Sequence, residues 1–145
     1  MPSGPAPPPP PPSPPPSSPS PSLSLIVPTL GRGAPIARLM RSLAAQSSND
    51  FEVIVIDQNE SSALVAQHLA GDWPFDLRHI STPGVRGVCR ARNEGLVHAR
   101  GRWVGFPDDD CWYPPKLVER VPPACGAGAA DFISGRPTDE AGRTG

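Results

Sequence analysis

The sequence predicts an α/β fold, a mainly parallel sheet with flanking helices. Short apolar segments rich in β-branched residues alternate with segments of helical periodicity along residues 23–120. The formal net charge is -1, so no basic field points to a nucleic-acid partner. No apolar run has the length of a transmembrane segment. The one skew in composition is proline, 23 of 145 residues, gathered at the front.

Residues 1–22 form a leader made almost entirely of proline and serine, which we expect to be disordered. Proline fixes φ and lacks an amide donor, so the leader favours polyproline II and cannot build a core. PxxP spacing recurs in it, which leaves open a role as a docking peptide for a partner that binds proline motifs. Residues 23–145 are expected to form one domain.

The domain begins with two buried strands separated by a helix. LSLIV (23–27) is apolar and is closed by Pro28, and FEVIVID (51–57) is β-branched and ends at Asp57. Between them, APIARLMRSLAAQ (34–46) has helical spacing. The side chains predicted on one face of this helix are Ile36, Leu39, Met40 and Leu43.

The same alternation then repeats. SSALVAQHLAG (61–71) predicts a short helix, FDLRHI (75–80) a third strand and RWVGF (102–106) a fourth. GVRGVCRARNEGLVHARG (84–101) opens with glycines and runs into a helix. The residues predicted along one face of that helix are Val88, Ala91, Gly95 and Ala99.

The last segments are short. A helix is expected to begin at Pro114 or Pro115, because proline suits the first turn, and to run to about Arg120. DFIS (131–134) is strand-like, and the tail after it is loop-like.

Polar residues follow three of the predicted strands: Thr29, Asp57 and Asp108–Asp110. The carboxyl ends of parallel strands meet at one edge, where such sheets bind ligands. Two like charges about 4 Å apart repel by roughly 4 kcal/mol at the effective dielectric of a protein surface, so the aspartates need a counter-charge. Mg²⁺ or Mn²⁺ would supply it. The alternative is an acidic turn that caps the following helix.

Arg86, Arg90 and Arg92 lie on the glycine-punctuated turn that opens into a helix. Backbone amides at the start of a helix, with guanidiniums nearby, suit a phosphate. If they face aspartates that hold a metal, the two groups together predict a diphosphate site. The alternative is a solvated helix face.

The three cysteines, Cys89, Cys111 and Cys125, form no CxxC pair. They indicate free thiols in a reducing compartment, so we expect a protein of the cytoplasm or of the membrane periphery. The neighbouring carboxylates should raise the pKa of the Cys111 thiol.

Four segments in order resemble glycosyltransferase family 2. They are LSLIVPTLGR, then LMRSLAAQSSNDFEVIVIDQNES, then PGVRGVCRARNEG, then the strand end RWVGFPDDD, and the resemblance runs from Leu23 to Val121. It implies a GT-A (Rossmann-like) fold and a metal-dependent, inverting transfer of a sugar from a nucleotide-diphosphate sugar to an acceptor hydroxyl. The acceptor is not identified. Mn²⁺ or Mg²⁺ is the implied cofactor.

The resemblance also assigns roles to residues. Asp110, with Asp108, would bind the metal; Asp108 would also lie near the ribose, and Asp57 would contact the base. Gln58 stands where the family often has a second aspartate. The residues implied in donor binding are Pro28, Thr29, Arg32, Asp57, Arg90, Arg92, Asn93, Asp108 and Asp109.

The family carries its acceptor half and catalytic base after the DxD strand, and no residue here matches that base. We therefore expect a fragment that holds the donor half. Two alternatives are a non-catalytic nucleotide-sugar-binding or interaction protein and a haloacid-dehalogenase-type phosphotransferase. The latter also uses Asp-x-Asp, but after its first strand.

Overall fold

The computed structural model describes residues 19–31 and 33–125, and after them residues 132, 134, 135, 138, 139, 141 and 143. Of the leader that we expected to be disordered, residues 1–18 lie outside the described residues and 19–22 lie within them. Among the residues described, no helix combines the length and hydropathy that would carry it through a lipid bilayer.

The described chain forms one parallel sheet in the order β3-β2-β1-β4. Its strands are β1 (Leu23–Thr29), β2 (Phe51–Asp57), β3 (Asp76–Ser81) and β4 (Trp103–Gly105). The helices are α1 (Ala34–Ala44), α2 (Ala63–Leu69), α3 (Val88–His98) and α4 (Leu117–Ala124). The predicted α/β class is confirmed.

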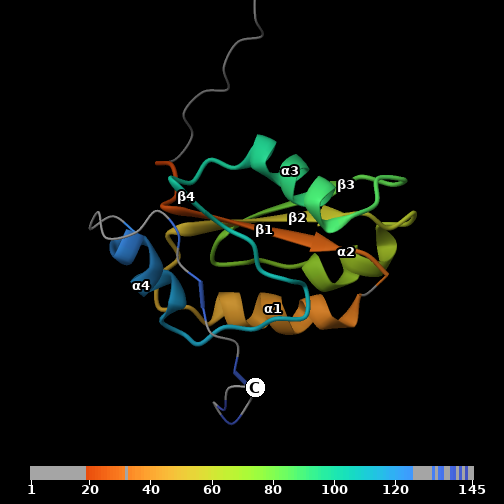
Figure 1. Ribbon diagram of the computed structural model, residues 1–145. Helices are drawn as coiled ribbons and strands as arrows, with labels where there is room; N and C mark the ends of the chain where they lie inside the picture. Colours follow the sequence, from red (N-terminus) through yellow and green to blue (C-terminus); the bar gives the residue numbers. More distant parts are fainter. Residues whose placement is uncertain are drawn as a thin grey trace, which may run out of the picture.

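Helices cover both faces of the sheet (Figure 1). On the face of α1, α2 and α4, odd-numbered strand residues such as Leu25 and Val53 pack against α1. The four apolar residues predicted on one face of α1 are buried there. On the face of α3, Ile26, Ile54 and Ile56 pack against Ala91. Because β1 and β2 are buried on both faces, their sequences are apolar runs without polar alternation.

Helix α3 lies close to β1 because it presents a glycine to the sheet. A Cβ added at Gly95 would stand 2.3 Å from Cγ2 of Ile26. Of the residues predicted along one face of this helix, Ala91 and Gly95 are buried, and Val88 is exposed because it lies in the first turn, at the rim of a hollow.

The limits of two elements differ from those expected. Strand β1 continues through Pro28 to Thr29. The nitrogen of Pro28 faces the side of β4, but β4 has already ended at Gly105, opposite Leu25, so no ladder bond is lost.

Helix α4 begins at Leu117, later than expected, and continues through Pro122 and Pro123 to Ala124. The carbonyl oxygens of Pro114 and Pro115 accept bonds from Gln46 Nε2 (2.8 Å) and the Ser47 amide (2.7 Å), which holds them outside the helix. For the strand expected at 131–134, residues 131 and 133 lie outside the described residues. Phe132 and Ser134 are not in a strand.

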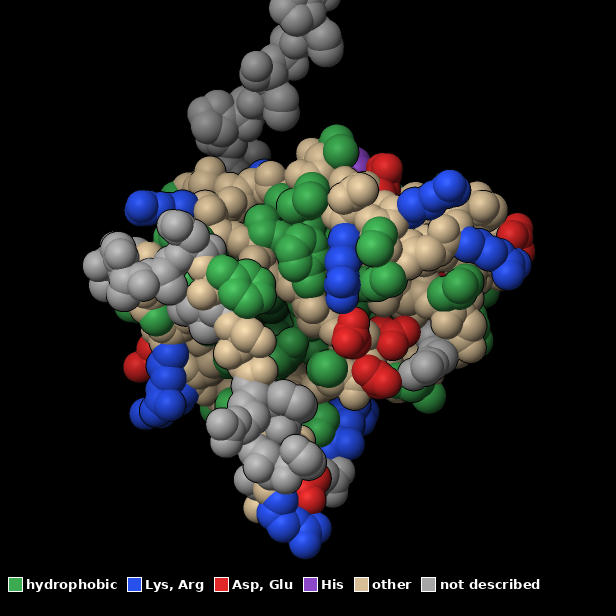
Figure 2. All heavy atoms as spheres, in the orientation of Figure 1, with side chains coloured by type: hydrophobic (Ala, Val, Ile, Leu, Met, Phe, Trp, Pro, Cys, Tyr) green, Lys and Arg blue, Asp and Glu red, His purple; other side chains and the backbone are tan. Residues whose placement is uncertain are grey.

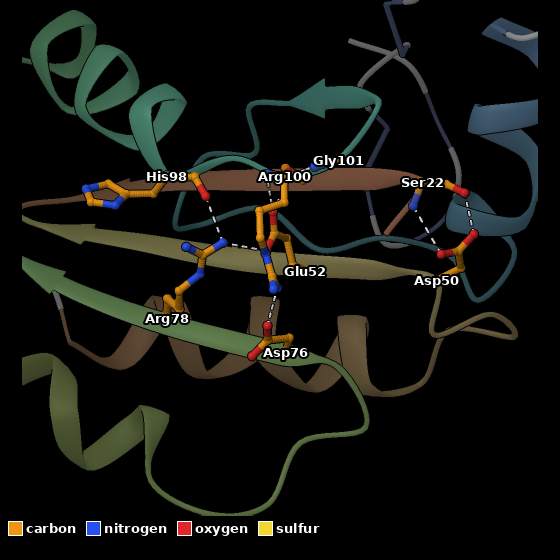
Figure 3. A network of polar contacts seen from close by, with 9 residues as sticks. Ser22, Asp50, Glu52, Asp76, Arg78, His98, Arg100 and Gly101 are labelled. Atoms are coloured by element: carbon orange, nitrogen blue, oxygen red, sulfur yellow. Dashed lines mark hydrogen bonds and ion pairs between the residues drawn. The ribbon is translucent and has the colours of Figure 1, made fainter. Parts of the chain in front are cut away.

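One buried carboxylate ties the end of α3 to the sheet (Figure 3). Glu52 accepts bonds from Ser24 Oγ at 2.6 Å, from the Arg100 amide at 2.7 Å and from Arg78 at 2.6 Å. Arg100 Nε adds a fourth at 2.9 Å, and Arg100 also contacts Asp76. Burial raises the pKa of Glu52, but these hydrogen bonds outweigh it and lower the pKa from 4.5 to about 2.

Candidate functional site

A hollow of about 400 Å³ lies at the carboxyl edge of the sheet. The chain leaves β1 toward β2 on one side, whereas β4 joins β1 on the other, so this edge contains the point where the strand order reverses. Parallel sheets bind ligands at such a point. The residues that line the hollow are Pro28, Thr29, Leu30, Gln58, Gly87, Val88, Asp108, Asp109 and Asp110.

The three aspartates after β4 divide into two kinds. Asp109 Oδ2 accepts a bond from Thr29 Oγ1 at 2.8 Å, which fastens the acidic turn to the end of β1. Asp108 and Asp110 are exposed, and their carboxylate oxygens lie with Cys111 Sγ within 4.8 Å of one another. Figure 2 shows acidic side chains gathered at the border of an apolar patch, with a basic side chain beside them.

Arg92 reaches the acidic turn from α3. Its guanidinium lies 3.4 Å from Asp108 Oδ1 and 5.5 Å from the centre of the Phe106 ring. Arg92 Nε is buried and has no hydrogen-bond partner among the described residues. Arg92 therefore places a positive charge beside Asp108, at a longer distance than a strong ion pair.

The other predicted residues of α3 stand farther out. Arg90 and Asn93 are exposed on the helix and are not among the described residues that line the hollow. Arg32 lies outside the described residues.

Asp57 lies at the end of β2, as predicted, but its carboxylate is fully buried. Oδ1 accepts bonds from the amide and the side chain of Asn59, at 3.0 and 2.8 Å, and Oδ2 lies 2.9 Å from His79 Nε2. Asn59 Oδ1 in turn accepts the Gly31 amide at 2.7 Å. Asp57 thus connects the ends of β2 and β3 with the loop after β1, and it does not line the hollow.

Burial raises the pKa of the Cys111 thiol, and the carboxylates of Asp108, Asp110 and Asp109 raise it further. The rise predicted from the sequence is confirmed, with burial as the larger cause. Burial likewise raises the pKa of Tyr113 to about 12. At neutral pH both groups are protonated, so neither is a nucleophile or an anionic ligand.

Sequence reasoning missed the role of Gln58 and Asn59. Gln58 is buried, and its Nε2 donates to the carbonyl oxygens of Val85 at 2.6 Å and Gly87 at 3.1 Å. Two amide side chains directly after a buried strand were the available signal, since such positions lie at the ligand edge of the sheet.

The profile of the family described as Glycosyl transferase family 2 matches residues 24–144. The chain belongs to this family. Its parallel sheet with flanking helices is that of the GT-A glycosyltransferases, and the family membership excludes the phosphotransferase alternative.

Two curated relatives illustrate the match. A protein of Haemophilus influenzae described as an uncharacterized glycosyltransferase is 33% identical over 99 residues, which are 68% of this chain and 33% of that protein. The GalNAc(5)-diNAcBac-PP-undecaprenol beta-1,3-glucosyltransferase of Campylobacter jejuni is 35% identical over 90 residues, 61% of this chain and 29% of the relative. The chain therefore spans about a third of the length of these relatives.

Solved glycosyltransferases have the same fold. Residues 1-349 of S. aureus TarS, in complex with UDP-GlcNAc, superpose with a TM-score of 0.61 at 26% identity, over 73% of this chain and 31% of that chain. The mannosyltransferase PcManGT of Pyrobaculum calidifontis, in complex with GDP-Man and Mn²⁺, gives 0.63 at 23% identity, over 83% of this chain and 36% of that one.

The acidic turn has the donor chemistry of a divalent-metal site. Asp108 and Asp110 offer hard oxygen ligands close together on an exposed rim, where water or phosphate could complete the shell. The Cys111 thiol adds little, because its raised pKa keeps it protonated.

Proposed function

We propose that this domain is the nucleotide-sugar-binding half of a metal-dependent, inverting glycosyltransferase. The observation that carries the proposal is the meeting, across one hollow, of Asp108 and Asp110 with the N-terminal end of α3. The carboxylates can hold a metal cation, and the helix N-terminus opposite them favours an anion such as a diphosphate. Together they suit a metal–diphosphate unit. The UDP-GlcNAc complex of TarS supports a nucleotide sugar as the donor.

In this proposal the chain's residues bind and orient the donor. Asp110 and Asp108 hold the metal, and Asp109 keeps the turn fastened to Thr29. When bound, Mn²⁺ or Mg²⁺ would stabilise the charge that develops on the departing nucleoside diphosphate. Arg92 adds positive charge beside Asp108.

The remaining predicted residues have less direct places. Pro28 and Thr29 form the end of β1 at the hollow, and Arg90 and Asn93 lie on the helix that a diphosphate would approach. Asp57 can contact a base only after a movement that exposes its carboxylate, since both of its oxygens are engaged by Asn59 and His79.

An inverting transfer needs a base that takes the proton of the acceptor hydroxyl as it attacks the anomeric carbon. We assign no base and no acceptor site among residues 19–31 and 33–125. A non-catalytic nucleotide-sugar-binding protein would have the same hollow, and it is distinguished by donor binding without turnover when acceptors are supplied.

Isothermal titration with UDP, GDP and dTDP, with and without Mn²⁺, tests the proposal. We expect one of the three to bind the wild type more tightly with Mn²⁺, and Asp110→Asn to lose about tenfold of that affinity, because a neutral amide is a weaker ligand for a hard cation.

Asp72→Asn, which removes an exposed carboxylate from the loop before β3, is the matched control and should bind as the wild type does. If Asp110→Asn and the wild type bind alike with Mn²⁺, the role of Asp110 is wrong. If the wild type binds none of the three nucleotides, the donor pocket itself is wrong.

A further inference from the structure

The turn before α3 is fastened at both ends to the end of β2. The Thr82 amide donates to the Asp57 carbonyl oxygen at 2.8 Å. Farther along the turn, Gln58 Nε2 donates to the Val85 and Gly87 carbonyl oxygens, at 2.6 and 3.1 Å. Gln58 itself is only 3% exposed, and its amide donates to the Thr29 carbonyl oxygen at 3.0 Å, so its position is set by β1 and β2.

Within the turn, the Val85 amide donates to the Thr82 carbonyl oxygen at 3.2 Å, and little else among the described residues holds it. Residues 83–87 are exposed, so apolar packing contributes little to their conformation. Gly84 and Gly87 have φ angles of 79° and 113°, in the region that favours glycine, and the freedom of glycine makes the turn costly to order. The hydrogen bonds from the end of β2 therefore contribute substantially to holding the turn in this conformation.

The turn matters because it ends in a wall of the hollow. Gly87 is the residue before the first turn of α3, and Gly87 and Val88 line the hollow opposite the acidic turn. A shift of Gly87 would change the distance between the N-terminal amides of α3 and Asp108–Asp110. If the hollow holds a metal and a diphosphate, that distance decides whether both are bound at once.

We infer that Gln58 is a positioning residue for donor binding, which holds the Val85–Gly87 segment at the hollow through its side-chain amide. The inference rests on the proposed function. Two carbonyl oxygens converge on one nitrogen, and an amide supplies the two N–H donors they require. A carboxylate of the same shape only accepts hydrogen bonds and would repel both oxygens.

The variant Gln58→Glu tests this by limited trypsin digestion, because Arg86 lies inside the turn and its bond to Gly87 is a trypsin site. Cleavage after the exposed Lys116, before α4, is the internal reference. We expect cleavage after Arg86 to become about tenfold faster than in the wild type, relative to cleavage after Lys116, because the turn opens more often.

The same variant should bind the nucleotide found by titration, in the presence of Mn²⁺, about tenfold more weakly. Gln67→Glu is the matched control, since it makes the same amide-to-carboxylate change on the exposed surface of α2, and it should alter neither measurement. If Gln58→Glu does not fold, Gln58→Met, which removes the donors without adding charge, takes its place in both assays.

The outcomes separate the two ideas. Wild-type rates of cleavage after Arg86, or wild-type nucleotide affinity, in the Gln58 variants would overturn the role of Gln58. Equal acceleration after Arg86 and Lys116 with a lowered unfolding midpoint would also overturn it, because that pattern belongs to a general loss of stability. Absence of nucleotide binding by the wild type would instead overturn the proposed function.

Discussion

Replacing Glu52 by glutamine should destabilise the fold in a way that depends on pH. The carboxylate is 1% exposed and lies between two guanidiniums, those of Arg78 and Arg100. Glutamine has nearly the same shape but no charge, so both arginines lose their shared partner (Figure 3). The cost is the loss of the attraction between the buried carboxylate and these two partly exposed guanidiniums.

The magnitude follows from the pKa. The folded state holds the pKa of Glu52 at about 2 instead of 4.5. A shift of that size corresponds to about 3 kcal/mol of stability, a large share of the 5–15 kcal/mol typical of a domain. Because the folded pKa is the lower one, this contribution is complete above about pH 5 and is lost as pH falls through about 2.

The assay is urea unfolding followed by tryptophan fluorescence at several pH values from 3 to 8. At pH 7 we expect Glu52→Gln to be less stable than the wild type by about 3 kcal/mol. We expect this difference to narrow at pH 3, because Glu52 of the unfolded wild type is protonated there, which favours unfolding. Asp76→Asn is the matched control. It removes an exposed partner of the same Arg100 and should cost less than about 1 kcal/mol.

Two results would refute this reasoning. One is a loss below about 1 kcal/mol at pH 7, which would mean that the network adds no net stability. The other is a loss that is the same at pH 7 and pH 3, which would mean that the charge of Glu52 is not the cause.

Two further changes test the packing of α3 and the attachment of the acidic turn. Gly95→Ala should destabilise the fold by about 1–3 kcal/mol, despite the better helix propensity of alanine, because the new Cβ would stand 2.3 Å from Ile26. Urea unfolding measures this loss, and a variant as stable as the wild type would contradict the prediction. Thr29→Val removes the hydroxyl that donates to Asp109 at 2.8 Å and should weaken Mn²⁺-dependent nucleotide binding about fivefold; an unchanged dissociation constant in the titration would show that this bond does not position the turn.

Much of the fold was predictable because its signals are local. The apolar runs of β1 and β2 and the helical spacing of α1 are patterns of residues close together in the sequence, and each predicted the right kind of element. The exact limits of α4 were not predictable. The carbonyl oxygens of Pro114 and Pro115 accept hydrogen bonds from Gln46 and Ser47, which are far away in the sequence, and this keeps both prolines outside the helix. Local propensity contains no information on such partners.

The candidate site divides in the same way. Placing Asp108–Asp110 and Thr29 at one edge required only the rule that parallel strands share a carboxyl end, and the structure does bring them to one hollow. The contact of Asp57 with His79 depends on the register of β2 with β3, which the sequence does not show. Its bonds to Asn59 are local, two residues along the chain.

The sequence by itself determined the family, the order of strands and helices along the chain, and the edge at which the polar residues gather. Only the tertiary structure decided which carboxylates are exposed to a ligand and which are buried and hydrogen-bonded within the domain. The physical reason is distance along the chain: helix and strand formation depend on neighbours a few residues apart, whereas Glu52 meets Arg100 and Thr29 meets Asp109 across separations of 48 and 80 residues. Contacts of that kind are fixed by topology and register, after the local elements have formed.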